Sequence, residues 1–537
     1  PYPYGALALS ASPRKGHKKS MLEGHLGQFS RRCILQTSVA AAAFGPLAAC
    51  ANTPAARAQT STERAAPEPI AVTPDYRAEP IADGVAQRDM LATGETTSLA
   101  LTEAAIARSR AAQPLINAVA TESYEAALEA AETPLDGGFG GVPTFIKDLL
   151  DWRGAQTLFG SRAFRGYVAP ADGAFAKAWR QAGMISLGKS TSPEMGLISS
   201  TEPLVTGATR NPFDLSRIPG GSSGGAAALV AARVVPFAHA SDGGGSIRIP
   251  AACCGLFGLK PSRGALPISR SAGAVDISVN HAVTLTVRDS AALFAAAEMD
   301  VQSDLAKTGA VTGPTQRRLK IAFAPEAATG AIVDRETQAA LERTAELCKG
   351  LGHEVIDFQV PFDGAEFTDR FFLYWAAGAA AFAQQASAFS GKPVGPDILE
   401  PWTLSLAQEF LRRSDEMDAT IAYLKAFEAE YHSWFEDFDV LLSPTVASVA
   451  PKIGEQAPDG DYETVRANVI NFAAFTPVMN VAGSPSMSVP IQWSSDGLPI
   501  GSMFSARRGD DGVLLALAYE LEAAQPWIDR RPVFKTS

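Results

Sequence analysis

The most constraining feature of this chain is a block rich in glycine and serine that lies inside an apolar frame, at residues 219–261. It contains two serine clusters, at residues 220–225 (Gly-Gly-Ser-Ser-Gly-Gly) and 242–248 (Asp-Gly-Gly-Gly-Ser-Ile-Arg). A solvated linker would not run directly into Ile247 and Leu256. Because glycine permits backbone conformations that other residues rarely adopt, this block can hold amide groups and hydroxyls at fixed positions. Nucleophilic attack on a carbonyl requires such an arrangement.

The composition limits the class of partner. The chain has 537 residues, of which 46% are hydrophobic, and a formal net charge of −11. A chain this acidic is not expected to bind nucleic acid or an anionic membrane surface as its main partner. The five cysteines and six histidines show no metal-binding spacing, no disulfide framework and no His-Glu-x-x-His pair. We therefore predict no metal and no organic cofactor.

The N-terminal part reads as three segments that precede the folded domain. Residues 1–20 precede the first methionine and are an upstream or added segment. Residues 21–50 contain Ser-Arg-Arg-Cys-Ile, typical of a twin-arginine export signal, and end in Leu-Ala-Ala-Cys50, which resembles a lipoprotein cleavage site. Residues 51–80, rich in Ala, Pro and Thr, read as a disordered tether. These segments predict an exported bacterial protein that is periplasmic or anchored through a lipid on Cys50. Simple cleavage and a chance Arg-Arg pair are the alternatives.

From residue 81 onward, apolar periodicity predicts alternating helices and short strands. Helices are expected over residues 97–112, 123–131, 174–183 and 336–350, with Ser98 and Thr121 as N-caps of the first two, and a long helical stretch over 363–435. Strands are expected over residues 141–147, 185–188, 235–238, 319–323 and 440–442. This alternation predicts one large α/β domain at residues 81–537, with a mixed or parallel sheet covered by helices on both faces.

Ser246 is the best candidate nucleophile because three glycines, Gly243, Gly244 and Gly245, directly precede it. In such a run successive N–H groups can point at one spot. Together with the N–H of Ser246 they could bind the oxyanion of a tetrahedral intermediate. A tight glycine turn before a strand is the alternative interpretation.

A serine nucleophile needs a base, and the sequence offers two candidates. His239 lies in the run Val-Val-Pro-Phe-Ala-His-Ala, which favours a histidine packed in the core. Lys147 has apolar residues on both sides, so burial could lower its pKa into the range of a general base. A lysine that extends to the surface is the alternative interpretation. With Lys147 as base, Ser222 or Ser223 could relay the proton.

Taken together, these segments resemble the amidase signature family, which uses a Ser–cis-Ser–Lys triad. The family motif Gly-Gly-Ser-Ser-Gly-Gly matches residues 220–225, Asp-x-Gly-Gly-Ser-Ile-Arg-x-Pro matches 242–250, and Gly-Val-Pro-x-x-x-Lys-Asp matches 141–148. Further matching segments are residues 188–196, 258–264, 480–485 and 496–501. The resemblance covers about residues 81–534 and implies the amidase-signature fold, a single α/β domain built on a mixed sheet.

The resemblance implies the three catalytic roles. Lys147 would be the neutral base, and Ser222, preceded by a cis Gly221–Ser222 bond, would relay protons. Ser246 would attack the amide carbonyl and form an acyl-enzyme. The family places the relay about two dozen residues before the nucleophile, which selects Ser222 rather than Ser223.

It also implies the residues around the triad. The oxyanion hole would consist of the N–H groups of the four residues Gly243, Gly244, Gly245 and Ser246. The site would be supported by Ser223, Asp242 and Arg248.

Within the family, the chain most resembles the 6-aminohexanoate-cyclic-dimer hydrolase type and related bacterial amidases. The matching stretches are residues 194–196, 201–203, 207–213 and 526–532. Two features depart from that type: the export signal, and the absence of a cysteine at residues 299–311, where the type has one in its substrate cleft. The cyclic dimer is therefore not the expected substrate.

The expected partner is a small-molecule amide, either an apolar or aryl amide or an oligoamide, with esters or carbamates as side substrates. The candidate lining of the acyl pocket is aromatic and comes from the long helical stretch: Phe371, Phe372, Tyr374 and Trp375. Core packing is the alternative role for these rings. The protein is expected to be a monomer or homodimer.

Three other functions were weighed. Residues 221–225 match the Gly-x-Ser-x-Gly elbow of an α/β-hydrolase esterase, with Ser223 as nucleophile, but Arg-Ile-Pro-Gly rather than a strand precedes them. An amidotransferase subunit is disfavoured by the export signal and the lack of a basic tract. A non-catalytic periplasmic binding lipoprotein would need a broken triad, whereas all three positions are intact.

Overall fold

The computed structural model describes residues 76–267, 273–298 and 303–534. The predicted segments 1–20 and 21–50, with Cys50, and most of the tether lie outside the described residues. Residues 76–80 already pack on the domain, because the Tyr76 hydroxyl donates to the Ala232 carbonyl at 2.6 Å and its ring contacts Phe534. The packed chain thus begins slightly before the predicted boundary at residue 81. Export and lipidation remain predictions.

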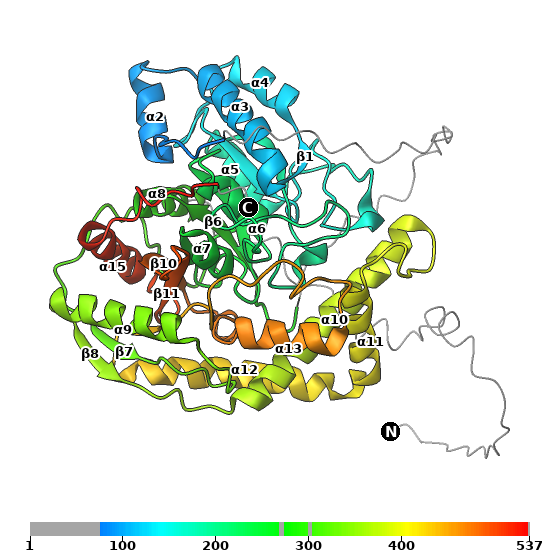
Figure 1. Cartoon of the computed structure of the whole chain (residues 1–537), viewed down its shortest axis with the longest axis vertical. Coiled ribbons are helices and arrows are strands. Elements are labelled where there is room, and N and C mark those ends of the chain that lie inside the picture. Colours follow the sequence, from blue (N-terminus) through cyan, green and yellow to red (C-terminus); the bar gives the residue numbers. More distant parts are fainter. Residues whose placement is uncertain (1–75, 268–272, 299–302, 535–537) are drawn as a thin grey trace, which may run out of the picture.

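Two sheets form the framework of the domain (Figure 1). The strands are β1 (Val119–Glu122), β2 (Pro143–Lys147), β3 (Ile185–Ser190), β4 (Phe237–Asp242), β5 (Phe257–Lys260), β6 (Val279–Thr284), β7 (Lys320–Phe323), β8 (Glu354–Asp357), β9 (Val440–Pro444), β10 (Ser486–Trp493) and β11 (Pro499–Ser505). The small sheet has the order β1-β3-β2, and the eight-stranded sheet has the order β4-β6-β5-β10-β11-β9-β7-β8. The pairs β9–β7 and β7–β8 are parallel, whereas the other pairs of the large sheet are antiparallel, so this sheet is mixed.

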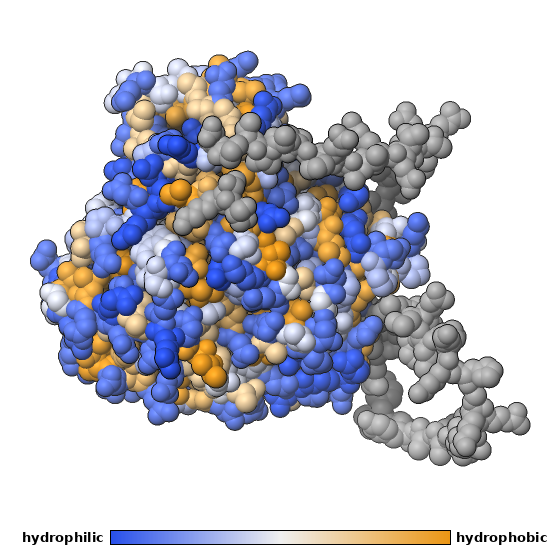
Figure 2. Space-filling view, in the orientation of Figure 1, coloured by the Kyte–Doolittle hydropathy of each residue, from blue (hydrophilic) through white to orange (hydrophobic). Residues whose placement is uncertain are grey.

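The helices surround these sheets (Figure 1). They are α2 (Gly84–Thr93), α3 (Ser98–Ile116), α4 (Tyr124–Ala131), α5 (Ala174–Gln181), α6 (Gly224–Ala231), α7 (Arg248–Cys254), α8 (Val287–Glu298), α9 (Arg335–Gly350), α10 (Gly364–Ser390), α11 (Pro401–Arg412), α12 (Met417–Ser433), α13 (Tyr462–Phe472), α14 (Pro477–Val481) and α15 (Asp511–Ala524). None of the helices in the described ranges is both long enough and apolar enough to cross a bilayer. On the face shown in Figure 2, hydrophilic and hydrophobic residues are interspersed.

Helices cover both faces of the large sheet, as predicted. Met487 and Val489 of β10 belong to the apolar core that includes α9 and α15. Ser488, between them, lies beside Gly501 of β11, where a β-carbon would collide with Ala252 of α7. Because successive strand side chains point to opposite faces, α9 and α15 cover one face and α7 covers the other. The predicted α/β class and single domain are confirmed.

Several element boundaries differ from the prediction. The N-cap of α3 is Thr97, whose hydroxyl accepts the Ala100 N–H at 3.1 Å, and not Ser98. Ser123, not Thr121, precedes α4. The long helical stretch is divided into α10, α11 and α12, because Gly391 in the left-handed conformation ends α10 and Pro401 starts α11.

Candidate active site

Four backbone segments bring the predicted site residues to one edge of the sheets. Strand β2 ends at Lys147, strand β4 ends at Asp242, and helix α6 begins directly after Ser222 and Ser223. Helix α7 begins at Arg248, so the turn that carries Ser246 lies between β4 and α7. Strand β2 is tied to β4 by the Thr144 hydroxyl, which donates to the Phe237 carbonyl at 3.0 Å.

The amine of Lys147 is completely buried and bonded to serine oxygens. Its Nζ lies 2.7 Å from Ser222 Oγ and 3.0 Å from Ser241 Oγ, and it donates to the Ser241 carbonyl at 3.3 Å. Burial lowers the pKa of Lys147 from 10.5 to about 7, against a small opposing effect of the Asp242 charge. A substantial neutral fraction at neutral pH is what a general base needs.

Two other buried lysines lack this arrangement. Burial lowers the pKa of Lys189 to about 8 and that of Lys260 to about 7. However, Lys189 Nζ donates to the Leu150 carbonyl, and Lys260 Nζ donates to the Pro261 carbonyl. Burial therefore does not distinguish Lys147 from these two lysines; its contact with the Ser222 hydroxyl does.

Ser222 lies behind Gly196, one of the residues that line the pocket around Ser246. The peptide bond between Gly221 and Ser222 is cis, as the family resemblance implies. Gly196, with φ of +71°, faces the Ser222 hydroxyl so closely that a β-carbon on Gly196 would lie 2.9 Å from Ser222 Oγ. Gly196, Gly221 and Ser246 all line the same pocket, so the Lys147–Ser222 pair and Ser246 converge on one space.

Ser223 has a different environment. Its hydroxyl lies 3.3 Å from the Ser241 carbonyl and 3.4 Å from the Ser241 N–H, and its side chain is fully buried beside α6. Ser223 therefore supports Ser241 and is not placed as a nucleophile. The esterase alternative, which required Ser223 as nucleophile, loses its support. Ser241, which touches both Ser223 and Lys147, was missed from the sequence. Its position directly before Asp242, at the start of the serine motif, is the sequence feature that could have identified it.

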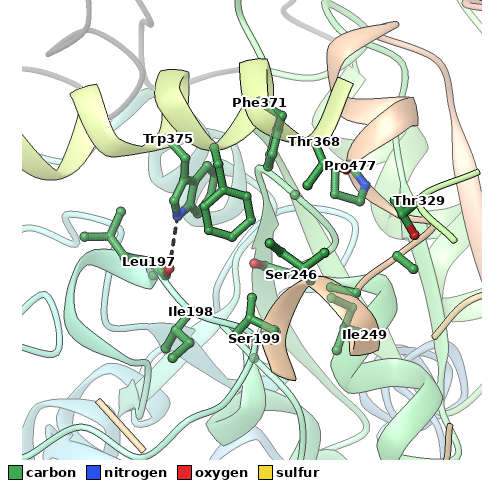
Figure 3. A pocket seen from close by; sticks show the side chains of 18 of the residues that line it. Leu197, Ile198, Ser199, Ser246, Ile249, Thr329, Thr368, Phe371, Trp375 and Pro477 are labelled. Carbon is green, nitrogen blue, oxygen red and sulfur yellow. Dashed lines mark hydrogen bonds between the residues drawn. The ribbon is translucent and has the colours of Figure 1, made fainter. Parts of the chain in front are cut away.

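Ser246 is 8% exposed and lies at the centre of the pocket in Figure 3. The N–H of Gly245 donates to Asp242 Oδ1 at 2.7 Å, so it is committed to the protein. This corrects the predicted oxyanion hole, which included Gly245. The remaining candidate donors are the N–H groups of Gly243, Gly244 and Ser246, and the Gly244 carbonyl is itself fixed by the Thr476 hydroxyl at 2.7 Å.

Asp242 and Arg248 form a buried ion pair that flanks the turn carrying Ser246. Arg248 Nε and Nη2 each donate to one oxygen of Asp242 at 2.9 Å. Burial alone would raise the pKa of Asp242, but the Arg248 guanidinium holds it well below its usual value. Asn480 completes the cluster, since its amide donates to Asp242 Oδ1 and it accepts from Arg248 at 2.6 Å. Asn480 lies in a segment that matches the family, but no role for it is predicted from the sequence.

We expect Asp242→Asn to destabilise the fold by about 3–5 kcal/mol, because it leaves the Arg248 cation buried with only neutral partners. Urea unfolding measures this change. Asp89→Asn is the matched control: Asp89 pairs with Arg88 on the surface, where its loss should change little. Equal effects of the two substitutions would contradict a structural role for the buried pair.

The pocket around Ser246 is lined mainly by apolar side chains and has about 680 Å³ of empty volume, including open solvent. The lining includes Leu197, Ile198, Ile249, Phe367, Phe371, Phe372, Trp375, Val469, Ile470 and Pro477, with Ser199, Thr329 and Thr368 as its other polar side chains. Three of the four predicted aromatic residues thus line it. Tyr374 does not, because its hydroxyl bonds the backbone of Val275 on another side of α10.

One wall of the pocket is hydrogen-bonded to helices α10 and α11. The carbonyl of Leu197 accepts the indole N–H of Trp375 and that of Trp402, each at 3.0 Å (Figure 3). Ser199 donates to Gln456 Oε1 at 2.7 Å. Since Gly196 faces Ser222, the two bonds to Leu197 link α10 and α11 to the backbone beside Ser222.

His239 is a core residue, as its apolar surroundings predicted. Its Nδ1 accepts the N–H of Lys147 at 3.2 Å, and its Nε2 lies 3.2 Å from Asn280 Oδ1. The ring packs against Phe175 and Trp179, and burial lowers its pKa well below 6.5. It positions the end of β2. In the described ranges, no three His, Cys, Asp or Glu side chains are grouped as metal ligands.

Fold and site together define an amide hydrolase. The chain matches the sequence model of the amidase family over residues 100–515, and it belongs to the amidase signature family. Membership makes it an enzyme and removes the alternative of a non-catalytic binding protein.

Relatives in sequence and structure agree with this assignment. The chain is 40% identical over 450 residues to AmiC of Mycobacterium tuberculosis, covering 83% of this chain and 95% of AmiC. It is 34% identical to the 6-aminohexanoate-cyclic-dimer hydrolase of Paenarthrobacter ureafaciens, covering 84% and 96% of the two chains. A structure of 6-aminohexanoate cyclic dimer hydrolase with its substrate has a TM-score of 0.77 at 32% identity, covering 84% of this chain and 98% of that one. A bacterial aryl acylamidase has a TM-score of 0.73 at 25% identity, with 84% and 97% covered.

Proposed function

We propose that this enzyme cleaves carboxylic amides through an acyl-enzyme on Ser246, with Ser222 as proton relay and Lys147 as base. The observation that carries the proposal is the 2.7 Å bond between a fully buried Lys147 amine and the Ser222 hydroxyl, behind the pocket that holds Ser246. A lysine with a pKa of about 7 can accept a proton that a lysine of ordinary pKa would not.

The proposed reaction has two halves. In the first, Ser246 Oγ attacks the carbonyl carbon while its proton passes to Ser222 and that of Ser222 passes to Lys147. The N–H groups of Gly243, Gly244 and Ser246 bind the oxyanion, and Ser222 then returns a proton to the leaving amine as the C–N bond breaks. In the second, water attacks the ester of Ser246 by the same relay and releases the acid.

Ser222→Ala is expected to lower kcat/KM for an amide by about 10²–10⁴, the usual contribution of a positioned proton-transfer group. Ser223→Ala is the matched control, because the adjacent hydroxyl contacts only the Ser241 backbone. Steady-state kinetics on an anilide measures both. A larger loss in Ser223→Ala than in Ser222→Ala would reverse the assignment of the relay.

We further propose that the preferred substrates are apolar or aryl amides, including linear oligoamides. The pocket carries no charged side chain, and Phe371 stacks on Trp375 with a centroid distance of 5.6 Å beside Ser246. An aryl group can pack against these rings. Two proteins similar to this chain, a bacterial aryl acylamidase and a 6-aminohexanoate-cyclic-dimer hydrolase, are compatible with this class.

Arylamides should therefore be hydrolysed faster than acetamide, and Phe371→Ala should reduce that preference. Loss of one buried aromatic contact corresponds to about 2- to 13-fold in kcat/KM, from the roughly 0.5–1.5 kcal/mol of an aromatic pair. Phe389→Ala, on the exposed end of the same helix, is the control. Equal or reversed rates on acetamide and anilides would remove this substrate assignment.

A further inference from the structure

The pocket around Ser246 borders a second space that the mechanism does not use. Thr329 and Pro477 lie on the side of Ser246 opposite Trp375 (Figure 3). Ala474 lines this pocket and also a second space, here called the inner pocket, with about 360 Å³ of empty volume, including open solvent. The inner pocket is lined by Ala324, Glu326, Ala328, Val360, Phe362, Trp434, Leu441, Ser443, Ala474, Phe475, Val478 and Met479. Ala474 is thus the lining residue that the two spaces share.

The inner pocket in turn meets an open hollow at the surface. Glu326, Ala328, Val360 and Phe362 line both spaces. This outer hollow lies at the ends of β7 and β8 and has about 1350 Å³ of empty volume, including open solvent. Shared lining residues therefore place the three spaces next to one another: Ala474 borders the pocket around Ser246 and the inner pocket, and Ala328 borders the inner pocket and the hollow.

The loop that carries Ala328 is held close to helix α10. A β-carbon on Gly364, the first residue of α10, would lie 2.0 Å from the Ala328 carbonyl oxygen. The loop therefore crosses the helix at a point where only glycine fits. Because Ala328 lines both the inner pocket and the hollow, a larger side chain at position 328 would reduce the space between them.

We propose that the substrate site extends past Ala474 into the inner pocket, where it binds the distal part of a long, linear apolar chain whose free end is neutral or cationic. This inference rests on the proposed function, because it concerns substrates of the same Ser246. It assigns Ala328 and Glu326 as specificity-determining residues outside the catalytic pocket.

The chemistry of the lining supports this class of chain. The inner pocket is walled by aliphatic and aromatic side chains, with Phe362 stacked on Trp434 at 5.6 Å. Its one charged lining residue is Glu326, and the charged lining residues of the outer hollow are Glu326 and Asp357. A nearby cation, Lys349, interacts electrostatically with Asp357, but its Nζ is paired with Glu346 Oε1 at 2.8 Å. A chain that ends in a carboxylate would meet like charge at Glu326, whereas an ammonium end would meet opposite charge.

The test uses two series of amides, one lengthened on the acyl side as anilides from acetyl to dodecanoyl and one on the amine side as N-alkyl benzamides. In at least one series kcat/KM should rise by up to about fourfold per added methylene, which corresponds to about 0.8 kcal/mol. Ala328→Leu should lower kcat/KM for the longest chains by about tenfold or more, the loss of two or more buried methylenes, and leave the shortest unchanged.

Ala327→Leu is the matched control, because Ala327 lines the outer hollow but not the inner pocket. Glu326→Gln should reduce the preference for chains that end in ammonium over chains that end in carboxylate. The inference fails if neither series depends on length, if Ala328→Leu and Ala327→Leu act alike, or if Glu326→Gln leaves the end-group preference unchanged.

A binding experiment separates this inference from the proposed function. Decylamine binding is measured by calorimetry in Ser246→Ala, in which the proposed nucleophile is absent, with and without Ala328→Leu. Weaker binding with Ala328→Leu supports the extended site even if the triad assignment is wrong. Unchanged binding, with short anilides still cleaved by the Ser246 enzyme, overturns the extended site and leaves the triad intact.

Discussion

Ser246→Ala is expected to lower kcat for an anilide by about 10⁴–10⁶, since loss of a serine nucleophile removes the covalent route and leaves only binding and oxyanion stabilisation. The reason lies in the geometry of the pocket. Ser246 is the hydroxyl that follows the candidate oxyanion donors, and the Lys147–Ser222 pair lies directly behind the same wall. Steady-state assays with purified protein measure the loss.

Ser199→Ala provides the matched control for this prediction. Ser199 lines the same pocket, but its hydroxyl donates to Gln456 Oε1 at 2.7 Å. Its removal should change kcat far less. If Ser199→Ala were as damaging as Ser246→Ala, or if Ser246→Ala kept most of the activity, the nucleophile would have to lie elsewhere.

Lys147→Ala should reduce kcat/KM by about 10²–10⁴ and should also change its dependence on pH. Only the neutral amine accepts a proton. Because the folded-state pKa of Lys147 is lowered to about 7, activity of the wild-type enzyme should rise as pH increases through that value and level off above it. Lys147→Ala should lose this rising limb.

Lys260 is the necessary control for the pH profile, because its pKa is also lowered to about 7. Its amine donates to the Pro261 carbonyl, and no role in proton transfer is proposed for it. Lys260→Met should therefore keep the rising limb, although it removes a buried charge. If the rising limb disappears in Lys260→Met and persists in Lys147→Ala, the titrating group is Lys260, which would contradict our account.

The parts of the site that lie in short motifs could be predicted from the sequence. Ser222, Ser246 and Lys147 each occupy a local pattern, and the order of these patterns identified the family. Lys147 reaches Ser222 because β2 and the segment before α6 end at the same edge. No single motif predicts that contact. The choice between Ser222 and Ser223 came from the family spacing, and it agrees with the bonds that each hydroxyl makes.

Other features depend on geometry that a sequence does not carry. Tyr374 and Trp375 are adjacent, but one residue turns a helix by about 100°, so only Trp375 faces the pocket. Gly245 was expected to donate to the oxyanion, whereas its N–H is taken by Asp242. Asn480 joins Asp242 and Arg248 across more than two hundred residues of sequence, a contact that only the folded chain reveals.

The most direct test of the central claim is the site of covalent labelling by a fluorophosphonate, mapped by mass spectrometry of the digested protein. The account predicts one adduct, on Ser246, that is absent from Ser246→Ala, slowed in Lys147→Ala and Ser222→Ala, and unchanged in Ser199→Ala. An adduct on Ser223, or labelling that persists in Ser246→Ala, would contradict it.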